Sequence, residues 1–183
     1  MVLIGLTGYA GSGKDTVRAM LEREGFVGLA FAEPIRSMLR ELLTSCGIDD
    51  EYIDERALKE TIIPELGVSY RHMAQSLGTE WGRNLRRDFW MRLAGAYMAD
   101  QQDAGETHFV VSDVRFDNEA NWIRNKGGQV WRIHRDGLAS VRPHVSESGV
   151  DGIKPSRTIH NNGTPEQLHE AVMAAVESLG VVV

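Results

Sequence analysis

Runs of apolar residues recur along the chain at intervals that a helix would fill. The first, residues 2–7, is apolar throughout, which is typical of a strand buried on both faces. Similar runs predict strands over residues 27–31, 109–112, 129–134 and, more briefly, 158–160. Because strands that alternate with helices pair in parallel through right-handed crossovers, we expect an α/β fold with a parallel sheet.

Between these runs, apolar residues recur every three or four positions, as on the buried face of a helix. Val17, Met20 and Leu21 share one face of a helix expected over residues 14–24, which Gly25 closes. Pro34 opens the next helix, since proline fits the first helical position. The apolar stripe of that helix is expected to comprise Ile35, Met38, Leu39, Leu42 and Leu43. Further helices are expected over residues 69–82, 89–98 and 118–125, and from Pro165 onward after the cap residue Thr164.

Two segments lack this regular pattern. Residues 49–65 are acidic and less regular, and residues 136–156 are rich in Gly, Pro and Ser, which predicts an ordered loop or lid. The length of 183 residues indicates one domain with a substantial core.

Candidate chemistry begins directly after the first strand. Residues 8–16 read GYAGSGKDT, a glycine-rich turn followed by a helix start and a lysine. Glycines let the backbone turn until successive N–H groups face an anion, and the helix adds its positive end. Lys14 adds a full charge, so the stretch predicts a phosphate-binding loop. The alternative is a glycine-rich turn that binds nothing.

The sequence leaves two candidates for the residue of this loop that binds magnesium. The usual pattern places Ser or Thr directly after the lysine, where the hydroxyl ligates magnesium. Here Asp15 follows, and Thr16 comes one residue later. Either Asp15 holds magnesium, directly or through water, or Thr16 takes over that role.

Other charged residues are expected near the same sheet edge. Asp113 ends the run 109–112, where it would assist magnesium or orient an acceptor, or simply form a turn. Phosphoryl transfer needs positive charge around the transferring group, and arginine matches phosphate oxygens. The preferred arginines are Arg36, Arg83, Arg115 and Arg135, which stand at the ends of predicted elements. The usual fate of an arginine is a solvated surface position, and that alternative applies to each.

Composition and charge exclude several classes of function. The net charge of −6 argues against a general nucleic-acid coat, which needs a basic surface. The single cysteine, Cys46, excludes an intrachain disulfide and a cysteine zinc site, and we expect it in the core. No apolar run approaches membrane-spanning length and no signal peptide is evident, so a cytoplasmic protein is expected. The histidines lack metal-ligand spacing, and no nucleophile elbow of a hydrolase occurs.

Several segments together resemble the phage-type deoxynucleoside monophosphate kinases, within the P-loop nucleoside monophosphate kinase group. The segments are GSGKDT (11–16), FAEPIR (31–36), LGTE (77–80) with Arg83 and Trp90, DVRF (113–116) with Glu119, Arg135, HVSE (144–147) and IHNNG (159–163). The resemblance implies a three-layer P-loop NTPase fold with a five-stranded parallel sheet. It also implies an acceptor-binding helical part at about 33–105, a lid at about 136–157 and a homodimer, in the host cytoplasm if the protein is phage-encoded.

The same resemblance implies transfer of the γ-phosphoryl group of ATP, with Mg²⁺, to a deoxynucleoside monophosphate. The implied catalytic residues are Lys14, Asp113, Arg115 and Arg135. ATP would be bound by Gly11, Ser12, Gly13, Lys14, Asp15, Thr16, Asn161 and Gly163, and the metal by Asp15, Thr16 and Asp113. The acceptor would be bound by Ile35, Arg36, Arg71, Gln75, Thr79, Glu80, Arg83 and Trp90, although Trp90 and Trp81 are by default core residues.

Two other functions compete with this one. Another small-molecule kinase with the same loop, acting on dephospho-coenzyme A or phosphomevalonate, would have a pocket for a pantetheine tail or an isoprenoid acid. A regulatory module would bind ATP without acceptor-dependent release of ADP. The acidic balance speaks against a polynucleotide end kinase.

Overall fold

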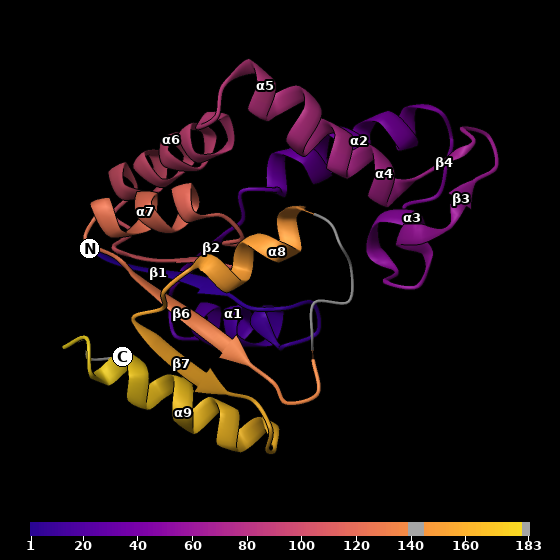
Figure 1. The fold of residues 1–183 in the computed structure, drawn as a ribbon. Helices are drawn as coiled ribbons and strands as arrows, with labels where there is room; N and C mark the ends of the chain where they lie inside the picture. The colour runs from indigo at the N-terminus through magenta and orange to yellow at the C-terminus, as the bar shows by residue number, and fades with distance from the viewer. Residues whose placement is uncertain (139–144, 181–183) are drawn as a thin grey trace. The chain divides into compact units, whose positions relative to one another are not determined.

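A sheet of five parallel strands organises the chain. The computed structural model describes residues 1–138 and 145–180, the side chains of 145–148 excepted. The strands are β1 (Val2–Thr7), β2 (Val27–Leu29), β5 (His108–Val111), β6 (Gln129–His134) and β7 (Arg157–His160). Their spatial order is β2–β5–β1–β6–β7, and all four neighbouring pairs are parallel (Figure 1). The predicted sheet is thereby confirmed.

The register of the sheet brings three strand ends together. Central β1 pairs with β5 through Gly5 and Val111, and with β6 through Thr7 and Arg132. Strand β1 lies between β5 and β6; the chain runs from β1 to β2 on the β5 side, and after β5 it crosses to β6 on the other side. The crevice beyond the carboxyl end of β1 is therefore a topological switch point. Open α/β sheets bind their ligands at such points.

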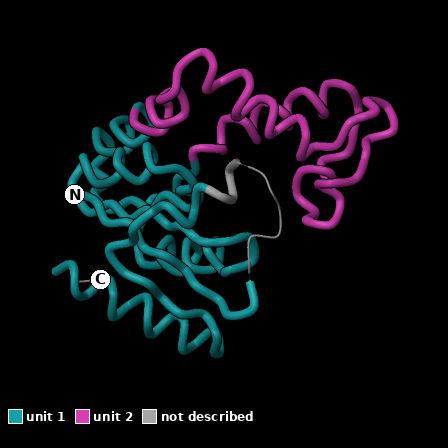
Figure 2. The backbone as a smooth tube through the Cα atoms, viewed as in Figure 1, with its two compact units in different colours: residues 1–30, 96–183 teal, residues 31–95 magenta. Residues whose placement is uncertain are grey.

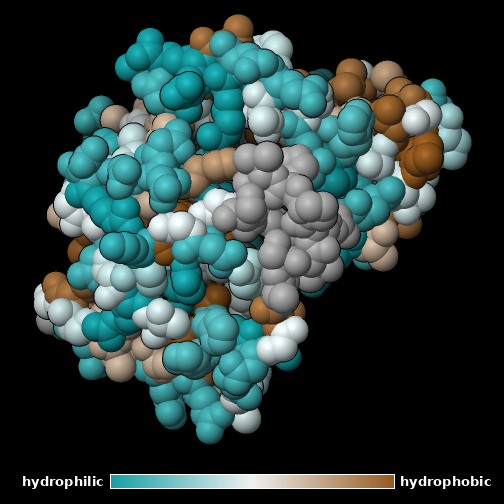
Figure 3. All heavy atoms as spheres, viewed as in Figure 1, coloured by the Kyte–Doolittle hydropathy of each residue, from teal (hydrophilic) through white to brown (hydrophobic). Residues whose placement is uncertain are grey.

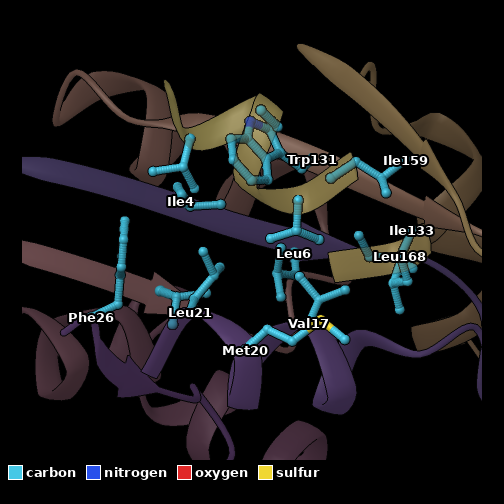
Figure 4. Close-up of a cluster of buried hydrophobic side chains, with 14 residues drawn as sticks. Ile4, Leu6, Val17, Met20, Leu21, Phe26, Trp131, Ile133, Ile159 and Leu168 are labelled. Carbon is cyan, nitrogen blue, oxygen red and sulfur yellow. The ribbon is translucent and has the colours of Figure 1, made fainter. Parts of the chain in front are cut away.

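Helices cover both faces of this sheet. They are α1 (Lys14–Arg23), α7 (Asp117–Asn125), α8 (Val145–Gly152) and α9 (Pro165–Glu177). Ile4 and Leu6 of β1 are fully buried with Val17 and Leu21 of α1 in one cluster, to which α9 also contributes (Figure 4). Each such side chain stabilises the fold by roughly 1.5–3 kcal/mol relative to exposure.

Gly5 lies between Ile4 and Leu6 and therefore faces the opposite side of the sheet. It has no side chain, so the sheet surface is nearly flat there. A Cβ atom on Gly5 would lie 3.0 Å from Val114 and 3.1 Å from Ile123 of α7. Glycine therefore lets α7 pack close to β1 and β6, opposite α1.

The chain divides into two compact units (Figure 2). Unit 1, residues 1–30 and 96–183, holds the sheet, and unit 2, residues 31–95, is largely helical. Unit 2 contains α2 (Glu33–Ser45), α3 (Glu51–Asp54), η1 (Leu58–Glu60), β3 (Ile62–Ile63), β4 (Val68–Ser69), α4 (Tyr70–Gln75), η2 (Ser76–Gly82) and α5 (Arg83–Leu85). Helix α6 (Phe89–Asp103) begins in unit 2 and ends in unit 1.

The acidic segment 49–65 is more regular than the sequence pattern predicts. Arg40 of α2 donates hydrogen bonds to Asp50 at 2.7 Å and to Asp54 at 2.8 Å, which ties the α3 turn to α2. Strands β3 and β4 then form a short antiparallel hairpin. Hydrophobic residues gather on its surface, with Ile62 61% and Leu66 39% exposed (Figure 3).

Three further expectations about local structure need correction. The stripe on α2 is narrower than predicted, because Met38 and Leu42 are 42% and 50% exposed. Cys46 is exposed rather than in the core, because α2 ends at Ser45 and the chain turns there. The helix expected over 69–82 is an α-helix only to Gln75 and continues as the π-helix η2, which hydrophobic spacing alone does not distinguish.

The segment expected as a loop or lid, 136–156, contains the helix α8. His144, the first residue of the HVSE segment, lies outside the described residues. Within the part of the chain that is described, no helix has both the length and the apolar character needed to cross a bilayer.

Candidate active site

The glycine-rich turn joins the end of β1 to the start of α1. Gly8, Gly11 and Gly13 have φ angles of +144°, +83° and +102°. L-amino acids with side chains rarely adopt these angles, so the glycines explain how the chain reverses within six residues. No side chain caps α1, whose first residue is Lys14. Its first N–H groups therefore face the turn, as at anion sites of other helix N-termini.

Lys14 lies folded over this turn. Its Nζ donates to the carbonyl oxygens of Gly8 at 2.7 Å and Tyr9 at 2.9 Å. The positive charge is thereby held above the loop rather than extended into solvent. The arrangement places an ammonium group and a helix N-terminus around one small volume, which suits a phosphate group.

Asn161, directly after β7, braces the turn from the other side. Its Nδ2 donates to the Ser12 carbonyl oxygen at 2.8 Å, and its backbone N–H donates to His134 at 2.7 Å. A Cβ atom on Gly13 would lie only 2.3 Å from Asn161 Nδ2. The family resemblance implies that Asn161 binds ATP, and in the structure its side chain contacts the loop that is expected to hold the ATP phosphates. Gly163 lies one residue before the α9 cap residue, Thr164.

The carboxyl end of β5 lies next to this turn. The N–H of Val114 donates to the Leu6 carbonyl oxygen of β1 at 3.1 Å, which fixes Asp113 beside the strand that enters the loop. Asp113 is half-buried, whereas Asp15 and Thr16, at the start of α1, are exposed.

These three residues present the oxygen donors that Mg²⁺ prefers. Among the described residues, no group of three or more His, Cys, Asp or Glu side chains could hold a metal by itself. In nucleotide sites Mg²⁺ is usually held by one or two carboxylates together with substrate phosphates, and Asp15 and Asp113 could supply the carboxylates. The donor set therefore suits magnesium bound with a nucleotide.

Arg115 follows Asp113 in a turn that Glu119 organises. One carboxylate oxygen of Glu119 accepts hydrogen bonds from the backbone N–H of Arg115 at 2.8 Å and of Phe116 at 3.1 Å. Glu119 is only 4% exposed. The sequence places it in a matching segment but gives no hint of this contact.

Helix α8 is fastened to the same edge of the sheet. Arg132 of β6 donates from Nη2 to the carbonyl oxygens of Val150 and Ile153, both at 2.8 Å. Tyr9, inside the glycine-rich turn, donates a short hydrogen bond to the Asp151 carboxylate, and this bond raises the pKa of Tyr9. Sequence reasoning missed Tyr9 and Asp151, since neither lies in a position that the motif specifies. Arg135 directly follows β6 and is exposed.

Unit 2 carries the residues expected to bind the acceptor. Ile35 is buried and Arg36 exposed at the start of α2. Arg71 donates from Nε to Glu60 at 2.9 Å, and Ser76 donates to Glu80 at 2.7 Å. Gln75 and Arg83 are half-buried, and Thr79 is exposed. Arg36 and Thr79 are therefore exposed, Arg36 beside Glu33 with 3.9 Å between Nη1 and Oε2, whereas Arg71 and Glu80 are held by neighbouring side chains.

Trp90 is a core residue of unit 2. It is 5% exposed, and its Nε1 donates to the Gly78 carbonyl oxygen at 2.8 Å, so it braces the π-helix from within. A Cβ atom on Gly82 would lie 2.3 Å from its ring. Trp81 is 43% exposed and packs edge-on against Phe89.

An open pocket of about 440 Å³ runs along α2, α4 and η2 in unit 2. Leu42, Leu77 and Trp81 are among its apolar lining, and Ser76 and Glu80 are its polar residues. Of these five, the sequence singled out only Glu80 as an acceptor-site residue. Leu42 and Trp81, noted above as partly exposed, both line this pocket.

Comparisons with known proteins decide the family. The family model "Deoxynucleotide monophosphate kinase" matches residues 48–172. A putative deoxynucleotide monophosphate kinase of Acanthamoeba polyphaga mimivirus is 32% identical over 192 residues, covering 97% of each chain. The chain belongs to the deoxynucleotide monophosphate kinase family. The match to the family includes the acidic segment 49–65, and the mimivirus relative extends the likeness over nearly the whole chain.

Two phage members of the deoxynucleotide monophosphate kinase family are longer than this chain. The enzyme of Enterobacteria phage T4 is 29% identical over 61% of this chain but only 46% of its own length. That of Escherichia phage RB69 is 30% identical over 57% of this chain and 43% of its own length.

Solved structures agree on the fold. TT1252 from Thermus thermophilus matches with a TM-score of 0.53 at 18% identity, covering 97% of each chain. A dephospho-CoA kinase from Campylobacter jejuni matches with a TM-score of 0.50 at 14% identity, covering 97% of this chain and 96% of its own. At these identities the likeness concerns the fold alone.

Proposed function

We propose that the protein transfers the γ-phosphoryl group of ATP to a deoxynucleoside monophosphate. The observation that carries the proposal is the glycine-rich turn, in which Lys14 and the uncapped N-terminus of α1 meet one small volume. Family membership supplies the class of acceptor. The proposal covers the whole catalysed reaction, although the chain spans less than half the length of its two phage relatives.

In this proposal the residues of the loop hold ATP before any bond changes. N–H groups of residues 11–16 donate to the β- and γ-phosphate oxygens, and the Lys14 ammonium moves from the loop carbonyls to those oxygens. Asp15, Thr16 and Asp113 hold Mg²⁺, which neutralises phosphate charge when bound. Asn161 keeps the loop in shape through its bond to Ser12.

Arg115 and Arg135 act at the transferring group. An oxygen of the acceptor monophosphate attacks the γ-phosphorus, and the bond to the β,γ-bridging oxygen breaks, which yields ADP and a deoxynucleoside diphosphate. Negative charge spreads over the γ-phosphoryl oxygens during this step, and two guanidinium groups placed there stabilise it. Both arginines follow strand ends at the same edge of the sheet as the loop.

The acceptor belongs to unit 2 in this proposal. Arg36, exposed one turn into α2, binds the monophosphate, with Arg71 and Arg83 as further cations. Thr79, Glu80 and Gln75 contribute polar contacts to the base or sugar beside Ile35, and Trp90 supports them from the core. The pocket with Glu80 and the exposed Trp81 ring supports this assignment, because a planar base gains both stacking and hydrogen bonds there.

The family resemblance also leads us to propose a homodimer in the cytoplasm, without nucleic-acid or membrane partners. The exposed side chains of Met38, Leu85 and Leu93 are apolar area that a second copy would cover. Light scattering during size-exclusion chromatography tests the dimer, and a monomer mass at micromolar concentration contradicts it.

One screen tests the function. Purified protein is given ATP and magnesium with each common deoxynucleoside and nucleoside monophosphate, with dephospho-coenzyme A and with phosphomevalonate, and ADP release is measured. We expect release with one or more deoxynucleoside monophosphates. Release only with one of the other two acceptors assigns the competing kinase function, and ATP binding without any acceptor-dependent release assigns the regulatory module.

A further inference from the structure

The buried carboxylate of Glu119 makes a contact that helix capping does not require. Glu119 is at the third position of α7, where an acidic residue favours the helix N-terminus and where its bond from the N–H of the cap residue Phe116 completes a capping box. Exposed Asp117 already supplies such a charge at the first position of α7. Arg115 precedes the cap position, Phe116, so its N–H is not among the donors that a helix start leaves unpaired. The 2.8 Å bond to that N–H therefore acts on the turn before the helix.

Burying the Glu119 carboxylate costs free energy, which the hydrogen bonds to the turn must offset. A carboxylate removed from water loses favourable hydration, and this loss destabilises the fold unless hydrogen bonds replace the water. Glu119 is 4% exposed and accepts two backbone N–H bonds from adjacent residues with one oxygen. Such charge-assisted bonds hold their donors more tightly than neutral ones do.

Two other elements fix the same stretch of main chain. The N–H of Val114 is bonded to Leu6 of β1 at 3.1 Å. On the far side, Gly149 of α8 lies so near that a Cβ atom there would be 2.5 Å from the Arg115 carbonyl oxygen. The Arg115 peptide is therefore held between α7 and α8, next to the strand that feeds the phosphate loop. The Arg115 side chain itself remains half-buried.

We propose that Glu119 is a positioning residue for phosphoryl transfer, which sets the main chain of Arg115 so that its guanidinium group meets the transferring phosphoryl group. The inference rests on the proposed function and adds to it the residue that aims Arg115. A flexible arginine side chain loses its alignment when its Cα atom shifts, and a displacement of about 1 Å costs on the order of 10²-fold in rate. Gly149 supports the same alignment from α8.

A double-mutant cycle separates positioning from general stability. The variants are Glu119→Ala, Arg115→Ala and both together, with kcat and the KM values for ATP and acceptor measured for each. We expect Glu119→Ala to lower kcat about 10–100-fold with little change in the KM for ATP. In the Arg115→Ala background the same change is expected to cost less than about twofold, because the group that it aims is gone.

Two controls accompany the cycle. Val172→Ala, in the core of α9, removes fully buried methyl groups and lowers the unfolding midpoint, but kcat is expected to stay unchanged. Glu119→Gln keeps an oxygen that accepts both N–H bonds and is expected to retain kcat within about fivefold. Should Glu119→Ala fail to fold, Gly149→Ala takes its place in the cycle, since its methyl group displaces the Arg115 peptide from the opposite side.

The inference is overturned if Glu119→Ala lowers kcat by the same factor in the wild-type and the Arg115→Ala backgrounds. It is also overturned if the wild type is active and Glu119→Ala has the same kcat. A wild type that releases no ADP with any acceptor contradicts the proposed function separately. In that case the Arg115 Nε–Hε NMR signal, followed on addition of ATP and magnesium, still tests the inference. A shift in the wild type that Glu119→Ala abolishes supports it, and an equal shift or no shift in both proteins refutes it.

Discussion

Replacing Gly13 with alanine tests the architecture of the phosphate loop with a single methyl group. Gly13 has a φ angle of +102°, and the added Cβ atom would lie 2.3 Å from Asn161 Nδ2. Real contacts of this kind do not occur, so either Asn161 gives up its 2.8 Å bond to Ser12 or the loop moves. Both responses disturb the N–H groups that the proposed function assigns to the ATP phosphates.

Gly105→Ala is the matched control for this change. Gly105 has a φ angle of +101°, and nothing lies within 4 Å of the position that its new methyl group would take. Both variants are destabilised by the unfavourable backbone angle, by about 1–2 kcal/mol. Only Gly13→Ala also loses the Asn161 bond, which adds about 0.5–1.5 kcal/mol. The difference of about 1 kcal/mol corresponds to a further drop of about 2–4 °C in Tm for a chain of this size.

Thermal unfolding and steady-state kinetics measure the two effects. We expect Gly13→Ala to melt below Gly105→Ala and to raise the KM for ATP about fivefold, which corresponds to a loss of about 1 kcal/mol of binding free energy. Gly105→Ala is expected to leave both kinetic constants near the wild-type values. Equal Tm shifts together with an unchanged KM for ATP would refute the reasoning, because the methyl group would then meet no constraint at Gly13.

Four further changes have defined outcomes. In the proposed function the Lys14 charge stabilises the transition state, so Lys14→Ala is expected to lower kcat about 10²–10³-fold, and an unchanged kcat contradicts the site. Arg36→Ala is expected to raise the KM for the acceptor and not for ATP; the reverse pattern puts Arg36 on the donor side. A hydrogen bond to the Asp151 carboxylate raises the pKa of Tyr9, so the stability that this bond contributes is present below pH 10 and is lost as pH rises through the raised pKa. Tyr9→Phe is expected to lower the unfolding midpoint at neutral pH and to lower it less at high pH; an equal lowering at both pH values is evidence against this bond. The hydrogen bond from Arg40 lowers the pKa of Asp54. The stability that this bond contributes is therefore present above about pH 4 and is lost as pH falls through the lowered pKa. Arg40→Met is expected to reduce the loss of stability at acid pH, and an unaltered loss refutes this role of the bond.

Much of the sheet could be predicted because continuous apolar runs have one structural solution in an alternating α/β chain. Residues 2–7 and 129–134 were expected as strands with the bounds that β1 and β6 have. The glycine-rich turn was equally readable, since positive φ angles at Gly11 and Gly13 need glycine.

Unit 2 was harder to predict because its order depends on contacts between distant residues. Arg40 organises an acidic segment that has no hydrophobic period of its own. The π-helix over Ser76–Gly82 is braced by Trp90, which lies twelve residues after Gly78 in the sequence. The indole Nε1 of Trp90 donates a hydrogen bond to the Gly78 carbonyl oxygen. Periodicity reports which face of a helix is apolar, but not how many residues each turn contains.

The same limit applies to the site. Lys14 and Asp113 stand in patterns whose spacing predicts phosphate and metal binding, so the sequence alone is enough to propose them. Glu119 accepts bonds from the main chain of the turn just before its own helix, and Asp151 accepts one from Tyr9, far away in the sequence. The neighbouring sequence does not distinguish either residue from a surface carboxylate, so these contacts become visible only when the fold is known.

The central claim is that the main chain after β1 wraps a triphosphate while Lys14 neutralises it. Backbone amide NMR signals, followed as ATP and magnesium are added to the wild-type protein, test it most directly. We predict that the largest shifts occur at residues 11–16 and are lost in Lys14→Ala. Saturable ATP binding that leaves the signals of residues 11–16 in place would contradict the account.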